Sequence, residues 1–215
     1  MPLFSKATPK LGSNDDPIRQ GLFACQSMKV LLGRTKLDGS PGPFQDISDA
    51  AMLAAGGKKE EARQRLRSIL ALPKLETRIQ LWVWSALREM GEQPDPKSGG
   101  EILGVVVEVP VQGAYDTLAA YQDGSARYLN FSGSAIFWDK PDPAIKNVCQ
   151  ALLGSAVSAG SRAKPRRDVS LPRSGMHATL LTRSGNYVIS DPPETTVKAA
   201  AALMAQLMSH AKQGK

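Results

Sequence analysis

The spacing of apolar residues changes near Gly100, and this change divides the predicted structure. Between Ser48 and Met90 apolar side chains recur at every third or fourth position, which is the period of an amphipathic helix. After Gly100 they alternate with polar residues at a period of two, which is typical of strands. The pattern therefore predicts a helical layer that is followed by a sheet.

Turn signals divide the helical part. A glycine pair at 56–57 and Pro73 interrupt the pattern, and Gly91 is suited to end the last helix. The stretch 57–62 (GKKEEA) and the apolar residues behind it loosely resemble the loop and second helix of a tetratricopeptide repeat. Because a solenoid needs about three such repeats, the resemblance predicts only a helical hairpin.

A shorter apolar stripe lies within residues 1–46, which are otherwise rich in Pro, Gly, Ser and Asp. Asp16 is suited to cap a helix and Pro17 to begin it, so the stripe predicts a helix up to Leu32. This helix would dock on a partner or a lipid surface, or pack back on its own chain. The second interpretation is favoured, because interfacial helices usually carry more Lys and Arg.

The alternating part predicts two groups of strands. The first strand spans the valine-rich stretch 105–111, whose odd positions should face the core. Pro110 places this strand at a sheet edge or ends it there, because proline cannot donate to a ladder. Three more strands form a meander up to Trp138, joined by an Asp-Gly and a Ser-Gly turn. A helix from Asp142 and a second hairpin (176–190) lead to a C-terminal helix.

Together these elements predict an α+β fold with an antiparallel sheet of five or six strands: a four-stranded meander, a helix, a hairpin and a helix, with the helices on one side. Residues 1–46 form a flexible N-terminal segment with one short helix, 47–92 a helical hairpin layer and 98–215 the α+β sheet domain. At the level of topology this order resembles small sheet-and-helix scaffolds of the roadblock or profilin kind, which mostly act by binding. A fold alone assigns no function.

Composition and charge narrow the function classes. The chain has 215 residues, of which 42% are hydrophobic and 22% charged, close to the globular averages of about 45–50% and 25%. Its net charge is +7, from 27 Lys and Arg against 20 Asp and Glu. Nearly all of this excess lies in residues 161–215. A chain-wide nucleic-acid surface would spread its basic groups over a face, so the sequence predicts a local basic contact at most.

The cysteines and the apolar runs indicate a cellular compartment. Cys25 and Cys149 show no CxxC or Cys/His spacing, so neither a disulfide framework nor a zinc site is expected. No run approaches the roughly 18 apolar residues of a membrane span, and residues 1–16 lack the apolar core of a secretory signal. We expect a cytoplasmic protein with reduced thiols, without a metal, a cofactor or a membrane span.

A basic loop spans residues 162–173 and gives the first alternative function, nucleic-acid binding. It lacks aromatic residues that would stack on bases, although the adjacent meander contains several. This alternative predicts strongly salt-dependent binding. Its candidate contacts are Arg162, Lys164, Arg166, Arg167 and Arg173.

Catalysis is the second alternative, as a hydrolase or transferase built around His177. A base of this kind needs a nucleophile and an orienting group, and Asp191 or Asp116 is the candidate for the orienting group. Cys149, however, falls on a buried helical stripe, and Glu108 is expected on the solvated side of its strand. No phosphate-binding glycine motif is present. This alternative predicts a polar pocket around His177.

The favoured function is a non-enzymatic protein-interaction or regulatory module. An antiparallel sheet has two edges that must be blunted or paired with a partner. Arg127, Tyr128 and Asn130 lie on a central hairpin strand and have the composition that interfaces favour. Trp82 and Trp84 point in different directions on one helix, and Trp84 is assigned to a contact with the sheet or a partner. We expect binding of another protein, or self-association, through a sheet edge or face.

Overall fold

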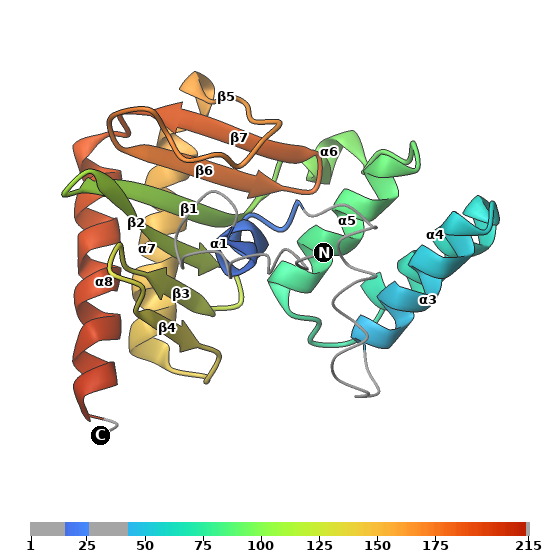
Figure 1. Cartoon of the computed structure of the whole chain (residues 1–215), viewed down its shortest axis with the longest axis horizontal. Coiled ribbons are helices and arrows are strands. Elements are labelled where there is room, and N and C mark those ends of the chain that lie inside the picture. The colour runs from blue at the N-terminus through green and yellow to red at the C-terminus, as the bar shows by residue number, and fades with distance from the viewer. Residues whose placement is uncertain (1–15, 26–42, 214–215) are drawn as a thin grey trace, which may run out of the picture.

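A seven-stranded antiparallel sheet forms the centre of the molecule, in the order β4-β3-β2-β1-β6-β7-β5 (Figure 1). The structure is a computed structural model, and it describes residues 16–25 and 43–213. The predicted α+β class with an antiparallel sheet is confirmed, with more strands than the five or six expected. The strands are β1 (Ile102–Val111), β2 (Ala114–Tyr121), β3 (Ala126–Leu129), β4 (Ala135–Trp138), β5 (Lys164–Pro165), β6 (His177–Thr182) and β7 (Gly185–Ser190).

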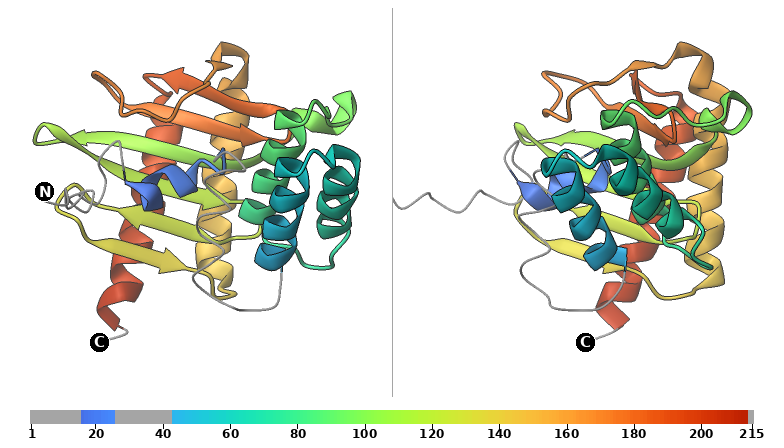
Figure 2. Two further views of the ribbon diagram at one scale, coloured as in Figure 1. Left: turned by 45° about the vertical axis from the view of Figure 1, so that its right-hand side comes forward. Right: turned by 90° about the vertical axis from the view of Figure 1, so that its right-hand side faces the viewer.

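Helices cover both faces of this sheet (Figures 1 and 2). The two helices of the sheet region, α7 and α8, lie on one side, as predicted. The N-terminal helix α1 and the helical layer cover the other side. The helices are α1 (Pro17–Leu22), α3 (Pro43–Ala55), α4 (Lys59–Leu70), α5 (Thr77–Glu89), α6 (Pro96–Gly99), α7 (Pro143–Ala159) and α8 (Glu194–Gln213).

Strand β1 is central and buried on both faces. Val105 and Val107 pack against α7 and α8, whereas Val106 packs on the side of α5, and all three are 0% exposed. The predicted edge position of this strand is wrong, because β1 pairs with β2 on one side and with β6 on the other. Pro110 is tolerated since it lies beyond Glu108, where the pairing with β6 ends.

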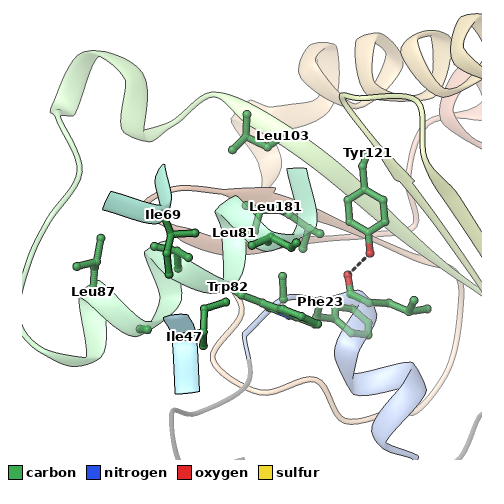
Figure 3. Close-up of a cluster of buried hydrophobic side chains, with 14 of the residues drawn as sticks. Phe23, Ile47, Ile69, Leu81, Trp82, Leu87, Leu103, Tyr121 and Leu181 are labelled. Carbon is green, nitrogen blue, oxygen red and sulfur yellow. Dashed lines mark hydrogen bonds between the residues drawn. The ribbon is translucent and has the colours of Figure 1, made fainter. Parts of the chain in front are cut away.

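The helical layer and the sheet share one hydrophobic cluster (Figure 3). Trp82 and Leu87 come from α5, and Leu103 and Tyr121 come from the sheet. Gly104 leaves room for this packing, because a Cβ atom there would lie 2.9 Å from a ring carbon of Tyr121. The predicted regions 47–92 and 98–215 therefore meet in a common core.

The breaks within the helical layer fall at the predicted positions. Three helices form the layer, with the glycine pair 56–57 between α3 and α4 and Pro73 between α4 and α5. The last helix gives way to Gly91, which has a φ of 89° and donates its amide to the Arg88 carbonyl at 3.0 Å. Gly91 therefore ends this helix, as its sequence position predicts.

Helix α1 packs back on the sheet, as the favoured interpretation predicts. The Asp16 carboxylate caps it by accepting from the Ile18 amide at 2.8 Å, and Pro17 is its first residue. The helix ends at Leu22, earlier than predicted, and the φ of 47° at Ala24 turns the chain away from the helical path. The later part of the predicted helix lies outside the described residues.

Candidate functional site

The two edges of the sheet differ in their capacity to pair with another strand. Strand β5 consists of Lys164 and Pro165, and short edge strands with lysine and proline resist further pairing. Strand β4, at the opposite edge, has four residues (AIFW), and its Phe137 is 51% exposed. The open edge of the sheet is therefore β4.

The register of β4 shows which of its backbone groups face outward. Asn130 and Ser134 form a hydrogen-bonded pair, in which the Asn130 amide donates to the Ser134 carbonyl at 2.9 Å. Hydrogen-bonded pairs alternate with non-hydrogen-bonded ones along an antiparallel ladder. The N–H and C=O groups of Ala135 and Phe137 therefore point away from β3. The edge offers two donors and two acceptors to a further strand.

A cavity of about 580 Å³ adjoins the end of β4. It lies between the segment that precedes α5, the β2–β3 turn and the start of α7. Most of its lining residues are of charged or polar types, and these are Lys74, Glu76, Asp123, Ser125, Asp139, Lys140, Asp142, Lys146, Asn147 and Gln150.

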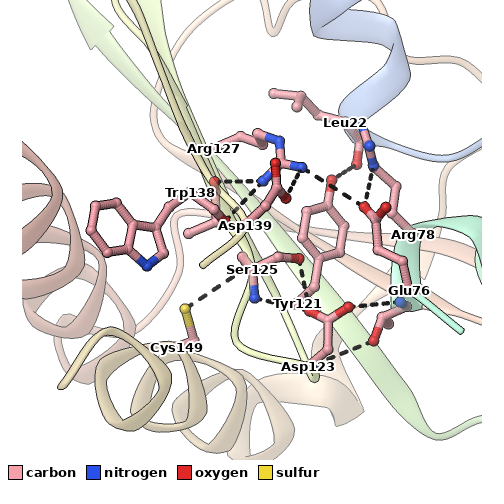
Figure 4. Close-up of polar contacts among 12 residues, drawn as sticks. Leu22, Glu76, Arg78, Tyr121, Asp123, Ser125, Arg127, Trp138, Asp139 and Cys149 are labelled. Atoms are coloured by element: carbon pink, nitrogen blue, oxygen red, sulfur yellow. Dashed lines mark hydrogen bonds and ion pairs between the residues drawn. The ribbon is translucent and has the colours of Figure 1, made fainter. Parts of the chain in front are cut away.

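Arg127 connects the sheet edge to this cavity (Figure 4). Its side chain is only 2% exposed and forms an ion pair with Asp139, the residue that follows β4. It also donates to the Trp138 carbonyl at 3.1 Å and lies over the Phe137 ring at 5.6 Å. Glu76, from the segment before α5, lies 3.8 Å from the same guanidinium. Arg127 therefore holds the end of β4 against the helical layer.

Other carboxylates around the cavity are also engaged. Asp123 accepts from the amides of Thr77 at 2.8 Å and Ser125 at 2.9 Å, and from the Ser125 hydroxyl at 2.7 Å. Partial burial acts to raise the pKa of Asp123, but these hydrogen bonds together hold the pKa below its ordinary value. Asp142 caps α7 by accepting from the Ala144 amide at 2.7 Å. These carboxylates have structural partners already.

Three lysines around the cavity have no such partner. Lys74, Lys140 and Lys146 are exposed, and none forms an ion pair within residues 16–25 and 43–213. The lining thus combines carboxylates that neighbouring donors already hold with three lysines that bind no carboxylate of the described residues.

The predicted partner-binding residues of β3 lie inside the fold or shape its turn. Tyr128 is 8% exposed and donates its hydroxyl to the Asp116 carboxylate at 2.6 Å. Burial and this hydrogen bond raise the pKa of Tyr128. Asn130 accepts from donors within the β3–β4 turn. The exposed surface expected at Arg127 and Tyr128 is wrong, because helices cover both faces of their strand.

The predicted contact residue of the helical layer, Trp84, is half-buried against the cluster that the layer shares with the sheet. Trp82 is buried and lies edge-on to Phe44, with the ring centroids 6.0 Å apart. Trp82 is therefore a buried member of this shared cluster, and Trp84 packs against it from a half-buried position.

Arg166 of the basic loop binds within the fold. Its guanidinium lies 2.6 Å from the Glu108 carboxylate and 2.7 Å from the Thr179 hydroxyl. Glu108 is 0% exposed, so its predicted position on a solvated face is wrong; the N-terminal segment and this loop cover that face. The remaining predicted nucleic-acid contacts are exposed, and they are Arg162, Lys164, Arg167 and Arg173.

His177 is half-buried and lies opposite Glu108 on the neighbouring strand. It does not line the cavity beside β4, nor two further cavities, one beside Tyr128 and Met204 and one beside Leu180 and Tyr187. Of its two candidate orienting groups, Asp116 binds Tyr128 instead, whereas Asp191 is exposed and follows Ser190, the residue that pairs with His177 on β7. Cys149 is 0% exposed, and burial raises the pKa of its thiol to about 12. These positions do not assemble a nucleophile and base around His177.

The sequence analysis did not predict the cavity beside β4, because the lining residues come from three separated stretches, 74–76, 123–125 and 139–150. The only part of the lining that the sequence analysis had located was Asp142, which was predicted to start a helix. Within the described part of the chain, no group of three or more His, Cys, Asp or Glu is placed to hold a metal ion, and no helix has the length and apolar character to cross a membrane.

Comparisons of the chain with protein-family models, with curated proteins and with solved structures found no match. The edge strand and its cavity are therefore interpreted from their own geometry.

Proposed function

We propose that this chain is a protein-interaction module that binds an extended segment of a partner along β4. The observation that carries the proposal is the open edge, where Ala135 and Phe137 direct backbone groups outward and Phe137 is 51% exposed. Strand addition of this kind draws affinity from main-chain hydrogen bonds and specificity from side-chain contacts. The opposite edge, β5, is too short for the same role.

The surroundings of β4 indicate the chemistry of the partner. A strand added to β4 would place a side chain beside the exposed Phe137 ring, which favours an apolar or aromatic residue there. Beyond the end of β4 the chain reaches Lys140, and Lys146 lies on the next helix. Acidic side chains at that end of the segment would face these lysines, mainly increasing the association rate.

The proposed location is the cytoplasm. Cys25 and Cys149 are both free thiols, which agrees with a reducing compartment.

A proline substitution tests the backbone contact directly. Phe137→Pro removes an outward donor without removing a hydrogen bond to β3, whereas Phe137→Ala keeps the donor and removes only the ring. Peptides are selected from a displayed random library on the full chain, and their affinities are measured on both variants. We expect about ten-fold weaker binding to the proline variant, as for the loss of one buried hydrogen bond, and a smaller loss for alanine. Selected peptides that bind the proline variant as tightly as the native chain would contradict the proposal.

The lysines supply a second measurement on the same peptides. Lys140→Glu with Lys146→Glu should slow the association of acidic peptides, most clearly at low salt. Lys198→Glu is the control, because Lys198 is 75% exposed and lies near the start of α8, whereas His210 near the end of α8 contacts Trp138 of β4. If the Lys198 variant slows association as much as the Lys140/Lys146 variant does, the cavity is not part of the binding site.

Self-association through β4 can be tested with the same protein variants. A dimer in sedimentation that Phe137→Pro converts to a monomer would identify a second copy of the chain as the strand that pairs with β4. Dimerisation that is unchanged in this variant would place the self-contact elsewhere.

A further inference from the structure

Residues 16–25 lie across the face of the sheet that is opposite α7 and α8, and side chains of the sheet hold their backbone (Figures 1 and 3). The Tyr121 hydroxyl of β2 donates to the Leu22 carbonyl at 2.7 Å. The side-chain amide of Asn186 on β7 donates to the Phe23 carbonyl at 3.0 Å. Hydrogen bonds to main-chain carbonyls do not depend on which side chains the segment carries. They hold the segment in place without specifying its sequence.

Two side chains of the segment make the specific contacts. Arg19 is 0% exposed and forms an ion pair with Glu108 of β1. Phe23 is also 0% exposed, and its ring lies 5.2 Å from the guanidinium of Arg19 and 4.8 Å from that of Arg166. The face therefore combines a buried carboxylate with an aromatic site between two cations.

The charge cluster is costly to bury. Burial lowers the pKa of Arg19 against the attraction of Glu108, and the Arg19 Nε atom has no hydrogen-bond partner among the residues that the structure describes. Buried ion pairs add little net stability compared with apolar residues of similar volume, and their best-attested use is to specify which partner or register is accepted. Arg19 and Arg166 bind different oxygens of Glu108, so a segment that lacks a cation at this position would leave one buried carboxylate oxygen without its present partner. The second cation, Arg166, lies 2.6 Å from Glu108 and belongs to the loop after β5 and not to the segment.

We propose that this face is a peptide-binding groove, that residues 16–25 fill it in cis, and that it accepts in trans a partner peptide with the pattern Arg-x-x-Leu-Phe. The arginine would bind Glu108 and the phenylalanine would stack on Arg166. The Tyr121 and Asn186 side chains would bind the peptide backbone. This groove is separate from the β4 edge and does not depend on strand addition there.

The test uses a fluorescein-labelled synthetic peptide of residues 16–25 and the full chain. In Arg19→Ala/Phe23→Ala the cis segment has lost both specific side chains. We expect the peptide to bind this variant at least ten times more tightly than the native chain, measured by fluorescence anisotropy. A peptide that carries Arg19→Gln should lose at least ten-fold in affinity for the same variant. Adding Glu108→Gln to the protein should also remove binding, whereas adding Glu194→Gln on exposed α8 should not.

Hydrogen exchange on the native chain covers the case in which the double variant does not fold. An excess of the peptide should increase amide exchange within residues 16–25, because it competes for their groove, and the Arg19→Gln peptide should not. The proposal is overturned if the peptide fails to bind a folded double variant, if Glu108→Gln leaves binding unchanged, or if the competing peptide leaves the exchange of residues 16–25 unaltered.

Discussion

The two faces of the sheet are both buried, but different kinds of contact bury them. Against α7 and α8 the sheet presents mainly aliphatic side chains, such as Val105 and Leu180, which meet Leu152 and Leu203 of the helices. The opposite face combines apolar residues with the ion cluster of Arg19, Glu108 and Arg166.

The two kinds of contact differ in how strictly they specify the residues that form them. Apolar contacts are non-directional, so many sequences of suitable volume would hold α7 and α8 in place. The ion cluster joins three parts of the chain that are distant in sequence, the N-terminal segment, β1 and the loop after β5, and it requires specific partners. We infer that the α7/α8 face builds the body of the molecule and that the opposite face recognises a particular segment.

The largest expected effect comes from removing the carboxylate at the centre of the ion cluster. Glu108→Gln keeps the side-chain volume but leaves Arg19 and Arg166 buried without a counter-charge. Breaking a buried ion pair from one side costs about 3–5 kcal/mol, so the free energy of unfolding should fall by about that amount in urea denaturation.

An apolar replacement of the whole cluster is the matched control. Arg19→Met with Glu108→Leu and Arg166→Met should cost much less than Glu108→Gln alone, because no buried charge is left unpaired. If Glu108→Gln changes the stability by less than 1 kcal/mol, the two faces do not differ in the way argued above.

The next effect in size is a cavity on the apolar face. Leu203 of α8 is 0% exposed, and Leu203→Ala should lower the free energy of unfolding by about 3 kcal/mol through lost burial and a residual cavity. Thermal or urea unfolding measures the change. Val157→Ala on exposed α7 surface is the control, since Val157 is 60% exposed and should have almost no effect. Binding of the Arg-x-x-Leu-Phe peptide should persist in folded Leu203→Ala, because the groove lies on the other face.

The apolar face was also the part of the fold that the sequence predicted well. Its strands alternate, its turns carry Asp-Gly and Ser-Gly, and α7 begins at a clear Asp-Pro signal, so local patterns were sufficient. The central place of β1 was missed, because Pro110 indicated an edge and nothing local showed that β6 would pair on its other side. A run of buried valines at 105–107 is typical of a strand covered on both faces, and this was the available signal.

The charged face was the part that sequence patterns described poorly. Glu108 alternates with valines as a solvated residue would, and Arg166 lies in a loop with four other basic residues. Only the tertiary packing of the N-terminal segment brings Arg19 to Glu108, across 89 positions of sequence. The sequence analysis expected an exposed sheet edge but did not assign it to β4. The residues that it assigned to binding, Arg127 and Tyr128, lie on the neighbouring strand β3 and are buried, because both faces of β3 are covered.

The smallest expected effect is a difference in pH response between the two faces. Asp123 lies in the β2–β3 turn and binds Thr77 at the start of α5, a helix on the face opposite α7 and α8, and its pKa lies below the ordinary value. A carboxyl with a lowered folded pKa stabilises the fold above its unfolded pKa of about 3.9, and the contribution disappears as the pH falls through the folded pKa. Asp123→Asn should therefore cost about 1 kcal/mol near pH 7, a small value because the residue is partly solvated. This cost should shrink as the pH falls below the unfolded pKa of about 3.9 and disappear below the folded pKa.

Urea midpoints of the native chain, Asp123→Asn and Leu203→Ala, measured from about pH 7 to about pH 2, check this difference. The loss caused by Leu203→Ala should stay constant across the range, since no titrating group is removed. A cost of Asp123→Asn that is equally constant would show that its hydrogen bonds to Thr77 and Ser125 do not depend on the charge of the carboxylate. In that case the acid sensitivity of the fold would have to arise from other carboxylates, and the charged face would not differ from the apolar face in its response to pH.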